Sequence, residues 1–491
     1  MYKIDWNKYL SYERERNSES KVGHKHEVDD LDLRNEFDSD FGRVIFSTAA
    51  RRMHDKTQVF PLTSGDSVHT RLTHSLEVMN IAVSLGSSMC RNKEFRDTYG
   101  ENSAYELEQK ICAILKTAAF VHDIGNPPYG HYGEDTIQKY FDKSNWRKFI
   151  QGFEEKEIKY VEDHILDFTE FDGNTEGFRI LTRGQYLGDL NGLNLTFASL
   201  GAYLKYPNNG PVEKEGYIGN HKHGIFATEE DVFNKIVDAC HMRNEDGTIK
   251  RHPLAFLVEA ADTICYTAMD LEDGISIGKI SVNSICEWVN DYVNANANHD
   301  DFTPDVMENG NFSLTALLKL KDHPYKKKKD VNFRVGLISY FVKLALNNFL
   351  LNLEAIDKGT YNKELLLDDP LHIAEALGNY AREYLFSDRF IVSAELAGRS
   401  VITGLLDIVL EKVLVEDPKK DIRIYRMLSD SGLKLIHHEY GLYEPEHDAD
   451  FKLKIKDIPL YYRLRLVVDW ISGMTDKYAV ETYQKLSGIK L

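Results

Sequence analysis

The sequence predicts an all-α fold, a large helical body with at most a small β-hairpin. Three observations carry this prediction. Apolar residues recur at helical spacing over long stretches such as 255–270. Runs of alternating polarity, which are typical of strands, are scarce, and the best place for a hairpin is 211–227. Pro127 and Pro207 stand where helical stretches stop, because proline cannot continue a helix.

The domain organisation follows from length and composition. The chain contains 491 residues, of which 42% are apolar, so it can bury a large core. Length alone would allow about three domains, but the sequence shows no internal repeat, low-complexity linker or clear domain boundary. We therefore expect a single body over residues 1–491, with a core at about 42–275 and a C-terminal helical part at about 290–491.

Composition excludes several classes of protein. The chain has no apolar run of about 18 residues, and its N-terminus is too charged for a signal peptide, so we expect no membrane contact. Five cysteines without CxxC spacing fit buried thiols in a reducing cytoplasm better than disulfides or a zinc site. The formal charge of −18 argues against a general nucleic-acid binder. A polyanionic substrate would need a locally positive pocket.

The first elements are expected in the following order. Residues 1–40 are polar and predict short helices and loops. A helix is expected from Gly42 to Val59, before an irregular turn that contains Pro61. Residues 91–108 are charged and predict a variable connection. An apolar helix then ends at the dipeptide His122-Asp123.

Further helices are expected over 178–187, over 195–206 and over 255–270, where apolar residues again follow a helical period. The C-terminal part shows amphipathic helical patterns over 360–415 and 458–488. These patterns support the all-α prediction for the whole chain.

The stretch Ala118–Glu134 concentrates groups that bind metal ions or transfer protons. An apolar helix places His122 and Asp123 side by side at its end, because the Gly/Pro-rich sequence that follows cannot continue the helix. His131 follows eight residues after Asp123, and Glu134 three residues later.

Two distant helices could complete a metal site. His74 lies in a helical stretch with apolar residues at core spacing, and Asp262 is a lone acid within the apolar run 255–270. An ionised carboxylate in so apolar a run needs a partner, because desolvating it unpaired is costly. Together with His122 and Asp123, these residues offer two imidazoles and two carboxylates. This set suits a divalent ion such as Mg, Mn, Fe, Co or Zn.

The order H…HD…D resembles the HD metal-dependent phosphohydrolase superfamily, and the match to one of its families, the deoxyguanosine triphosphate triphosphohydrolases (dGTPases), is closer. Segments resembling that family run from about residue 27 to 485 in the family's order. They are KTQVFPL (56–62), TRLTH (70–74), HDIGNPPYGHYGE (122–134), DGNTEGFR (172–179), LKYP (204–207), EAADTICY (259–266) and SGMTDKYA (472–479). The resemblance implies an HD metal-binding core at about 42–275.

The resemblance also implies residues that bind the substrate. Gln58 would contact the deoxyribose through its neutral amide. Arg71, one helical turn before His74, would reach a phosphate oxygen at the metal. Lys205 and Lys222 would hold the β- and γ-phosphates, beside Tyr206.

The helix 255–270 carries three polar residues at intervals of four, Asp262, Tyr266 and Asp270, which places them on one face. The resemblance implies that Tyr266 packs under the sugar and that Asp270 accepts a hydrogen bond from the 3′-hydroxyl. A tyrosine there leaves little room for a 2′-hydroxyl and would select deoxynucleotides. Arg334, on a long apolar helix, is a further candidate for a phosphate contact.

The implied chemistry is hydrolysis of dGTP to deoxyguanosine and inorganic tripolyphosphate, with cleavage on the 5′-oxygen side of the α-phosphorus. A divalent ion would polarise the phosphate and lower the pKa of a bound water. His131 and Glu134 resemble the family's catalytic pair, in which Glu134 orients His131. Whether His131 acts as a base, an acid or a nucleophile stays open.

Two other functions stay open. One is an HD-type nucleotide phosphodiesterase or phosphatase with a different cleavage position, and the other is a DNA- or nucleotide-binding regulator with a structural metal. The family commonly forms hexamers, and some members are modulated by single-stranded DNA or by dNTPs, so the resemblance implies a homo-oligomer and such an effector. The lysine run 326–329 is most simply a solvated loop, but it could attract DNA or an anion.

Overall fold

The structure is a computed structural model that describes residues 1–16, 34–58, 69–185, 189–296, 326–414, 423–442 and 457–490. Within these ranges it is helical and contains no β-strand, which confirms the prediction of an all-α fold. Two isolated β-bridges occur, one between Thr57 and Thr70 and one between Arg243 and Ile249. No helix in the described ranges is both long and apolar enough to cross a membrane. The predicted turn breaker Pro61 lies outside the described residues.

The hairpin expected at 211–227 is absent. A short 3₁₀ helix, η5 (Ile218–Asn220), lies inside this stretch in place of strands. The side-chain amide of Asn208 donates hydrogen bonds to the carbonyls of Pro211 and Lys222, at 3.1 Å each. These two carbonyl oxygens therefore accept hydrogen bonds from a side chain instead of from a neighbouring strand.

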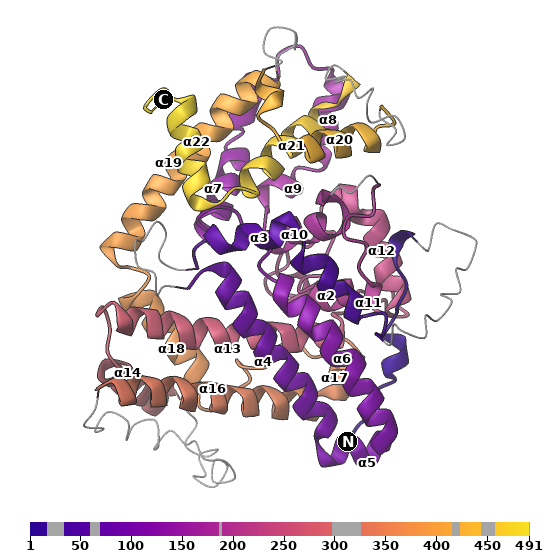
Figure 1. The fold of residues 1–491 in the computed structure, drawn as a ribbon, viewed down its shortest axis with the longest axis vertical. Coiled ribbons are helices and arrows are strands. Elements are labelled where there is room, and N and C mark those ends of the chain that lie inside the picture. Colours follow the sequence, from indigo (N-terminus) through magenta and orange to yellow (C-terminus); the bar gives the residue numbers. More distant parts are fainter. Residues whose placement is uncertain are drawn as a thin grey trace.

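Three long helices form the centre of the molecule: α4 (Arg71–Arg91), α6 (Glu101–Val121) and α13 (Pro253–Ser276). α4 lies lengthwise beside α6, and α13 packs against both (Figure 1). The side chain of Thr70 caps α4, and the proline that opens α13 has no amide hydrogen to leave unpaired in the first turn. The centre of the molecule is thus built from helices with well-defined starts.

Buried apolar side chains form two clusters. The first surrounds α4, α6 and α13, and the second surrounds α7 (His131–Asp142), α19 (Arg389–Val413) and α21 (Leu460–Ser472). α19 joins the two, because Ile391 belongs to the first cluster and Leu405 to the second. Figure 1 shows α19 running between the two groups of helices. The division of the chain into a core and a C-terminal part stays a prediction.

The helix expected from Gly42 to Val59 is broken. α2 covers Asp38–Ile45 and α3 covers Thr48–Arg52, followed by a 3₁₀ turn. The hydroxyl of Ser47 accepts a hydrogen bond from the amide of Ala50 at 3.1 Å, so it caps a new helix at this point. Gln58 therefore lies in a bend beyond both helices.

The segment 91–108, expected to be a variable connection, is largely helical. α5 covers Lys93–Tyr99, and α6 begins after Gly100, whose φ of 84° separates the two helices. The lysine run 326–329 is not a loop but the first turn of α16 (Lys326–Leu351), so Arg334 lies inside this helix. The side chains of 326–328 lie outside the described part of the chain.

The helix expected over 178–187 begins earlier, as α10 (Gly173–Arg179), and continues into one π-helical turn. The helix expected over 195–206 is the shorter α11 (Phe197–Tyr203), so Lys205 and Tyr206 follow it. The remaining expected helices are present, and they are α13, α18 (Ile373–Tyr384), α19, α21 and α22 (Asp476–Leu486).

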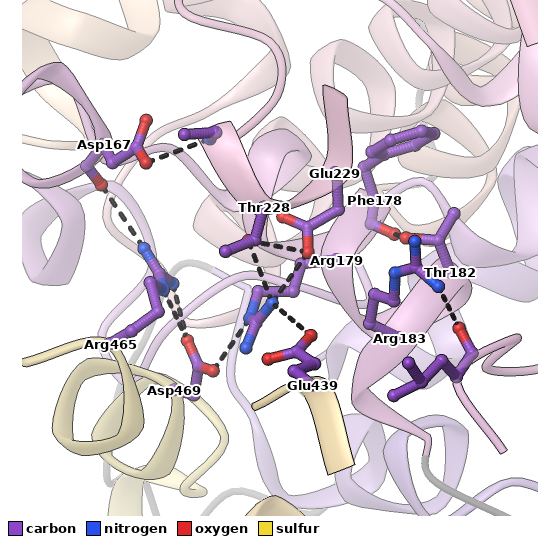
Figure 2. Close-up of polar contacts among 12 residues, drawn as sticks. Asp167, Phe178, Arg179, Thr182, Arg183, Thr228, Glu229, Glu439, Arg465 and Asp469 are labelled. Carbon is purple, nitrogen blue, oxygen red and sulfur yellow. Dashed lines mark hydrogen bonds and ion pairs between the residues drawn. The ribbon is translucent and has the colours of Figure 1, made fainter. Parts of the chain in front are cut away.

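A buried ion network fixes α10 against α21. Nη1 of Arg179 lies 2.7 Å from Glu229, and its Nε lies 2.8 Å from Asp469. Arg465 contacts Asp469 at 2.6 Å and Glu176 at 2.7 Å. Figure 2 shows Asp469 between the two guanidinium groups. Removing one member would leave buried charges unpaired, so the network strongly specifies the position of α10.

Candidate active site

A cavity of about 560 Å³ lies where α4, α6, α11 and α13 meet the start of α19. It brings together most of the predicted site residues, which are Gln58, Arg71, His122, Asp123, His131, Lys205, Tyr206, Lys222, Asp262, Tyr266 and Asp270. His74 and Glu134 lie directly behind this lining, each in contact with one of its members. The structure therefore brings these distant segments together at one cavity.

The four predicted metal ligands form a compact group. Candidate ligand atoms of His74, His122 and Asp123 all lie within 4.8 Å of one another. Oδ1 of Asp262 is 3.1 Å from Nε2 of His74 and 3.4 Å from Nε2 of His122. Two imidazole nitrogens thus face two carboxylates across a gap of the size that a divalent ion occupies.

His122 is held in the orientation and tautomer that a metal ligand needs. Its Nδ1 lies 2.8 Å from the carbonyl oxygen of Ala119, to which it donates a hydrogen bond. Its Nε2 is buried and makes no hydrogen bond of acceptable geometry, although Asp262 lies nearby. A buried nitrogen without a partner, next to carboxylates, fits the donor set of a bound divalent cation.

The charges of this group are set by mutual attraction. Burial opposes ionisation of Asp123, but the Arg71 guanidinium and the two imidazoles outweigh it and lower the pKa of this carboxyl to about 2. Burial also opposes protonation of His122, but Asp123 and Asp262 raise its pKa to about 9. Both carboxylates are therefore ionised at neutral pH and available to a cation.

Arg71 approaches the same carboxylate from α4. Its Nη1 donates to Oδ2 of Asp123 at 2.6 Å, while the side-chain amide of Asn126 donates to Oδ1. Gly130 makes this approach possible, because a Cβ at this position would lie 2.3 Å from Nη2 of Arg71. Arg71 is thus fixed beside the metal group, where its remaining N–H groups can meet a phosphate.

At the start of α7, Glu134 orients the side chain of His131. Nδ1 of His131 lies 2.7 Å from Oε2 of Glu134, and the other carboxylate oxygen accepts the amide hydrogen of Gly173 at 2.7 Å. The His131 side chain is 82% exposed, whereas that of Glu134 is only 6% exposed. The charge and hydrogen bond of Glu134 raise the pKa of His131. The pair resembles a carboxylate-oriented acid–base histidine with its Nε2 free.

A cluster of cations surrounds Tyr206. Nζ of Lys205, Nζ of Lys222 and Cζ of Arg251 lie 5.5, 5.7 and 5.5 Å from the centre of its ring. Three cations therefore gather at one ring, where an acidic protein can offer contacts to a polyanionic substrate, although Arg251 is also paired with Glu259 at 2.9 Å.

Both lysines of this cluster are also held by carboxylates. Lys222 forms an ion pair with Asp172, and Lys205 lies 3.4 Å from Glu259. The ammonium groups are therefore held in place beside the cavity before any substrate binds.

The predicted sugar contacts share the other side of the cavity. Oε1 of Gln58 is buried and has no hydrogen-bond partner, and the Tyr266 ring is 39% exposed. Burial, together with Asp273 and Asp262, raises the pKa of Asp270 well above its ordinary value. Asp270 is thus held toward its neutral form, which can donate a hydrogen bond as well as accept one.

One predicted residue lies elsewhere. Arg334 does not line the cavity, and its Nη1 lies 2.6 and 2.8 Å from the two carboxylate oxygens of Glu272 on α13. The predicted phosphate contact of Arg334 therefore finds no support in this arrangement. The cause is helix packing, which places α16 along α13 and sets Arg334 opposite Glu272.

Other cavity residues escaped the sequence analysis. Asn126 and Tyr129 lie within the motif that contains the His-Asp dipeptide, so their position was a usable signal. Phe386, Ile391 and Glu395 come from the region around the start of α19, which contributes the far wall. No local pattern marks these three residues, because only tertiary packing brings them to the cavity.

Comparison with known proteins gives two matching family models and full-length relatives. The HD domain family model matches residues 71–169, and the phosphohydrolase-associated domain model matches residues 433–485. The chain is 32% identical to the deoxyguanosinetriphosphate triphosphohydrolase-like protein of Listeria monocytogenes, over 99% of this chain and 100% of that protein. It is 31% identical to the deoxyguanosinetriphosphate triphosphohydrolase of Cronobacter sakazakii and 29% identical to that of Salmonella typhimurium, over 100% of each chain in both pairs.

Proposed function

The chain belongs to the deoxyguanosinetriphosphate triphosphohydrolase family of HD-domain phosphohydrolases, and we propose that it hydrolyses dGTP, and other dNTPs more slowly, to deoxynucleoside and inorganic tripolyphosphate. The observation that carries this proposal is a single cavity that joins three groups: a four-ligand metal set, the His131–Glu134 pair and the cations around Tyr206. Together these groups can activate a phosphate, transfer a proton and neutralise the charge of a triphosphate.

The residues present fit a divalent cation. His74, His122, Asp123 and Asp262 would hold it, with Mg or Mn as the candidates that oxygen- and nitrogen-rich sites accept. When bound, such an ion polarises phosphate oxygens and favours the ionised form of a coordinated water. These four side chains leave room for non-protein ligands, which favours a catalytic site over a structural one.

The triphosphate would be bound by the cationic side chains. Arg71 beside Asp123 suits a bidentate phosphate contact, and Lys205 and Lys222 suit point contacts further along the chain of phosphates. Their carboxylate partners Glu259 and Asp172 keep them in place until a phosphate competes for them. Fixed charges of this kind stabilise the charge that develops during phosphoryl transfer.

The acid–base step is assigned to His131. Glu134 holds its Nδ1, so Nε2 is the nitrogen that can exchange a proton on the α-phosphorus side. The hydrogen bond from Gly173 fixes Glu134 in turn, and α10 carries Gly173 at its first position. The orientation of His131 thus depends on the placement of α10.

Selectivity for the sugar and the base is assigned to the opposite wall. Tyr266 would exclude a 2′-hydroxyl, and Gln58 and Asp270 would bind the deoxyribose. Glu395 supports a preference for guanine, because a carboxylate can accept hydrogen bonds from both N1–H and the 2-amino group, which adenine does not offer in this arrangement. Phe386 and Ile391 provide apolar contacts beside it.

The other expectations from the family resemblance are part of the same proposal. We expect a cytoplasmic homo-oligomer, a hexamer by that resemblance, with single-stranded DNA or a dNTP as candidate effector. Size-exclusion chromatography with light scattering tests the oligomer. Activity titrations with oligonucleotides and with a second dNTP test the effector.

The test is a product assay. Purified protein is incubated with each dNTP and each NTP, with Mn or Mg, and the phosphate products are separated by chromatography. Tripolyphosphate and deoxyguanosine, formed fastest from dGTP, would support the substrate, the cleavage position and the sugar selection together. Pyrophosphate or monophosphate would indicate an HD-type phosphodiesterase or phosphatase. No product with any metal would favour a binding protein with a structural metal.

A further inference from the structure

The C-terminal segment SGMTDKYA (472–479) contains a buried carboxylate whose contacts reach the cavity. Asp476, the first residue of α22, is 3% exposed. Its Oδ2 accepts hydrogen bonds from the amide and the hydroxyl of Thr57, at 3.1 and 2.5 Å. Its Oδ1 accepts the amide hydrogen of Tyr129 at 3.0 Å. One side chain thus receives three donors from two segments that are far apart in the sequence.

Both segments held by Asp476 belong to the cavity wall. Thr57 and the adjacent Gln58 line the side assigned to the sugar, and Tyr129 lines the side that leads into His131. Tyr129 has a φ of 63°, in the left-handed region that non-glycine residues rarely adopt. The hydrogen bond from its amide to Asp476 helps to hold this strained turn.

A second buried side chain ties the same three segments together. Lys56 is 3% exposed, and its Nζ donates to the carbonyl oxygens of Asn126 and Ser472. Asn126 in turn donates to the metal-site carboxylate of Asp123. We call Lys56, Thr57, Asn126, Tyr129, Ser472 and Asp476 the brace.

We propose that Asp476 is a positioning residue for the reaction, a role that rests on the proposed function. Its two carboxylate oxygens join the Gln58 segment to the turn that precedes His131, so they set the distance between the sugar end and the acid–base end of the cavity. Asp476 does not line the cavity. Its effect on the reaction is therefore indirect.

Through the brace, the C-terminal part of the chain contributes indirectly to catalysis. Ser472 ends α21 and Asp476 begins α22. The contacts of Ser472 with Lys56 and of Asp476 with Thr57 and Tyr129 therefore all come from the ends of the short turn between these two helices. A cavity wall that is misplaced by about 1 Å can lose about 100-fold in rate. The C-terminal helices are thus required for the active geometry, although their residues contribute none of the assigned catalytic groups.

The experiment compares Asp476→Asn with Asp40→Asn. Asp40 is a matched control, because it is fully buried and accepts hydrogen bonds from the amide and hydroxyl of Thr196 at 3.1 and 2.6 Å, away from the cavity. Both variants lose a charged acceptor of a threonine amide and hydroxyl, and Asp40→Asn also weakens the ion pair between Asp40 and Arg14, which lies 2.7 Å away. Melting temperature, Mn binding by calorimetry, kcat and KM for dGTP, and hydrogen exchange are measured for each.

We expect Asp476→Asn to lower kcat about 100-fold while Mn binding is retained, and to speed hydrogen exchange in peptides covering 56–58 and 126–131. Asp40→Asn should lower the melting temperature without either change. Equal kcat values for wild type and Asp476→Asn, or unchanged exchange in these peptides, would overturn the proposal. If the wild-type protein turns over no nucleotide, the proposed function fails, and the exchange data still decide whether Asp476 holds the two segments.

Thr57→Val provides a second variant in case Asp476→Asn does not fold. It removes the hydroxyl donor and keeps the backbone hydrogen bond to Asp476, so a smaller drop in kcat with the same pattern of exchange is expected. A Thr57→Val protein with wild-type exchange and wild-type kcat would contradict the role of this contact.

Discussion

Nδ1 of His122 donates a hydrogen bond to the carbonyl oxygen of Ala119 at 2.8 Å. Both residues lie at the end of α6, so the helix itself orients the imidazole and leaves Nε2 free beside Asp123 and Asp262. Because this hydrogen bond places the proton on Nδ1, Nε2 is the nitrogen that can bind a metal. The position of the helix end is therefore part of the metal site.

The first prediction concerns metal binding. His122→Ala removes a nitrogen ligand, so it should abolish the rise in melting temperature that Mn gives the wild-type protein. That rise corresponds to about 2.7 kcal/mol at a Mn concentration about 100 times the Kd. His54→Ala is the control, because the His54 side chain is 72% exposed. The same Mn-dependent rise in His122→Ala and wild type would contradict the assigned ligand set.

The second prediction concerns the acid–base pair. Glu134→Gln keeps the shape of the side chain and its contact with Gly173 but removes the negative charge beside His131. We expect kcat to fall by about 10²–10³-fold, within the range of acid–base contributions.

The pH dependence separates this role from a structural one. Glu134 raises the pKa of His131, so Glu134→Gln should move the His131 limb of the pH–rate profile to lower pH while Mn binding is unchanged. A lower kcat with an unmoved profile would mean that Glu134 acts on folding or on another group.

The third prediction concerns the sugar. Tyr266→Ala should open space for a 2′-hydroxyl and raise the ratio of kcat/KM for GTP to that for dGTP by about 10-fold or more. Tyr266→Phe is the matched variant, since it keeps the ring and should keep the preference for dGTP. Both ratios come from the same product assay. An unchanged ratio in Tyr266→Ala would assign sugar selection to another residue.

Local patterns marked the candidate metal ligands that the structure brings together, because these residues stand out in their own segments. His122 and Asp123 stand where an apolar helix ends, and Asp262 is a charged residue within an apolar helix. Both features can be recognised in the sequence without tertiary structure. The break of the helix at Ser47 could also have been predicted, since serine is a common N-cap residue. A continuous helix was predicted because apolar residues continue across the break.

Residues whose surroundings depend on packing were not predictable in the same way. Arg334 could meet a phosphate or a carboxylate equally well, and the contact of α16 with α13 decides in favour of Glu272. Glu395 reaches the cavity from α19, and Asp476 reaches Thr57 from α22, without a local pattern that gives either distance. Long-range contacts of this kind require the packed structure.

The fourth prediction concerns stability and pH. His69 lies two residues before Arg71, with Nδ1 2.8 Å from Oδ1 of Asp273 and Nε2 3.2 Å from Oε1 of Glu77. The hydrogen bonds to Asp273 and Glu77 outweigh burial and raise its pKa to about 10 from an unfolded value of 6.5. The folded protein therefore binds this proton more tightly than the unfolded chain.

The difference between the folded and unfolded pKa of His69 decides how its contribution to stability changes with pH. Because the folded pKa is the higher one, the stabilisation by His69 is fully present below pH 6.5 and is lost as the pH rises toward 10. His69→Gln should lower the free energy of unfolding by about 2 kcal/mol near pH 6, the size of hydrogen bonds to charged groups. The deficit should shrink steadily between about pH 7 and pH 10. Melting temperatures of both proteins across this range measure it, with His54→Gln as the exposed control, and a deficit that stays constant with pH would show that His69 is neutral in the folded protein.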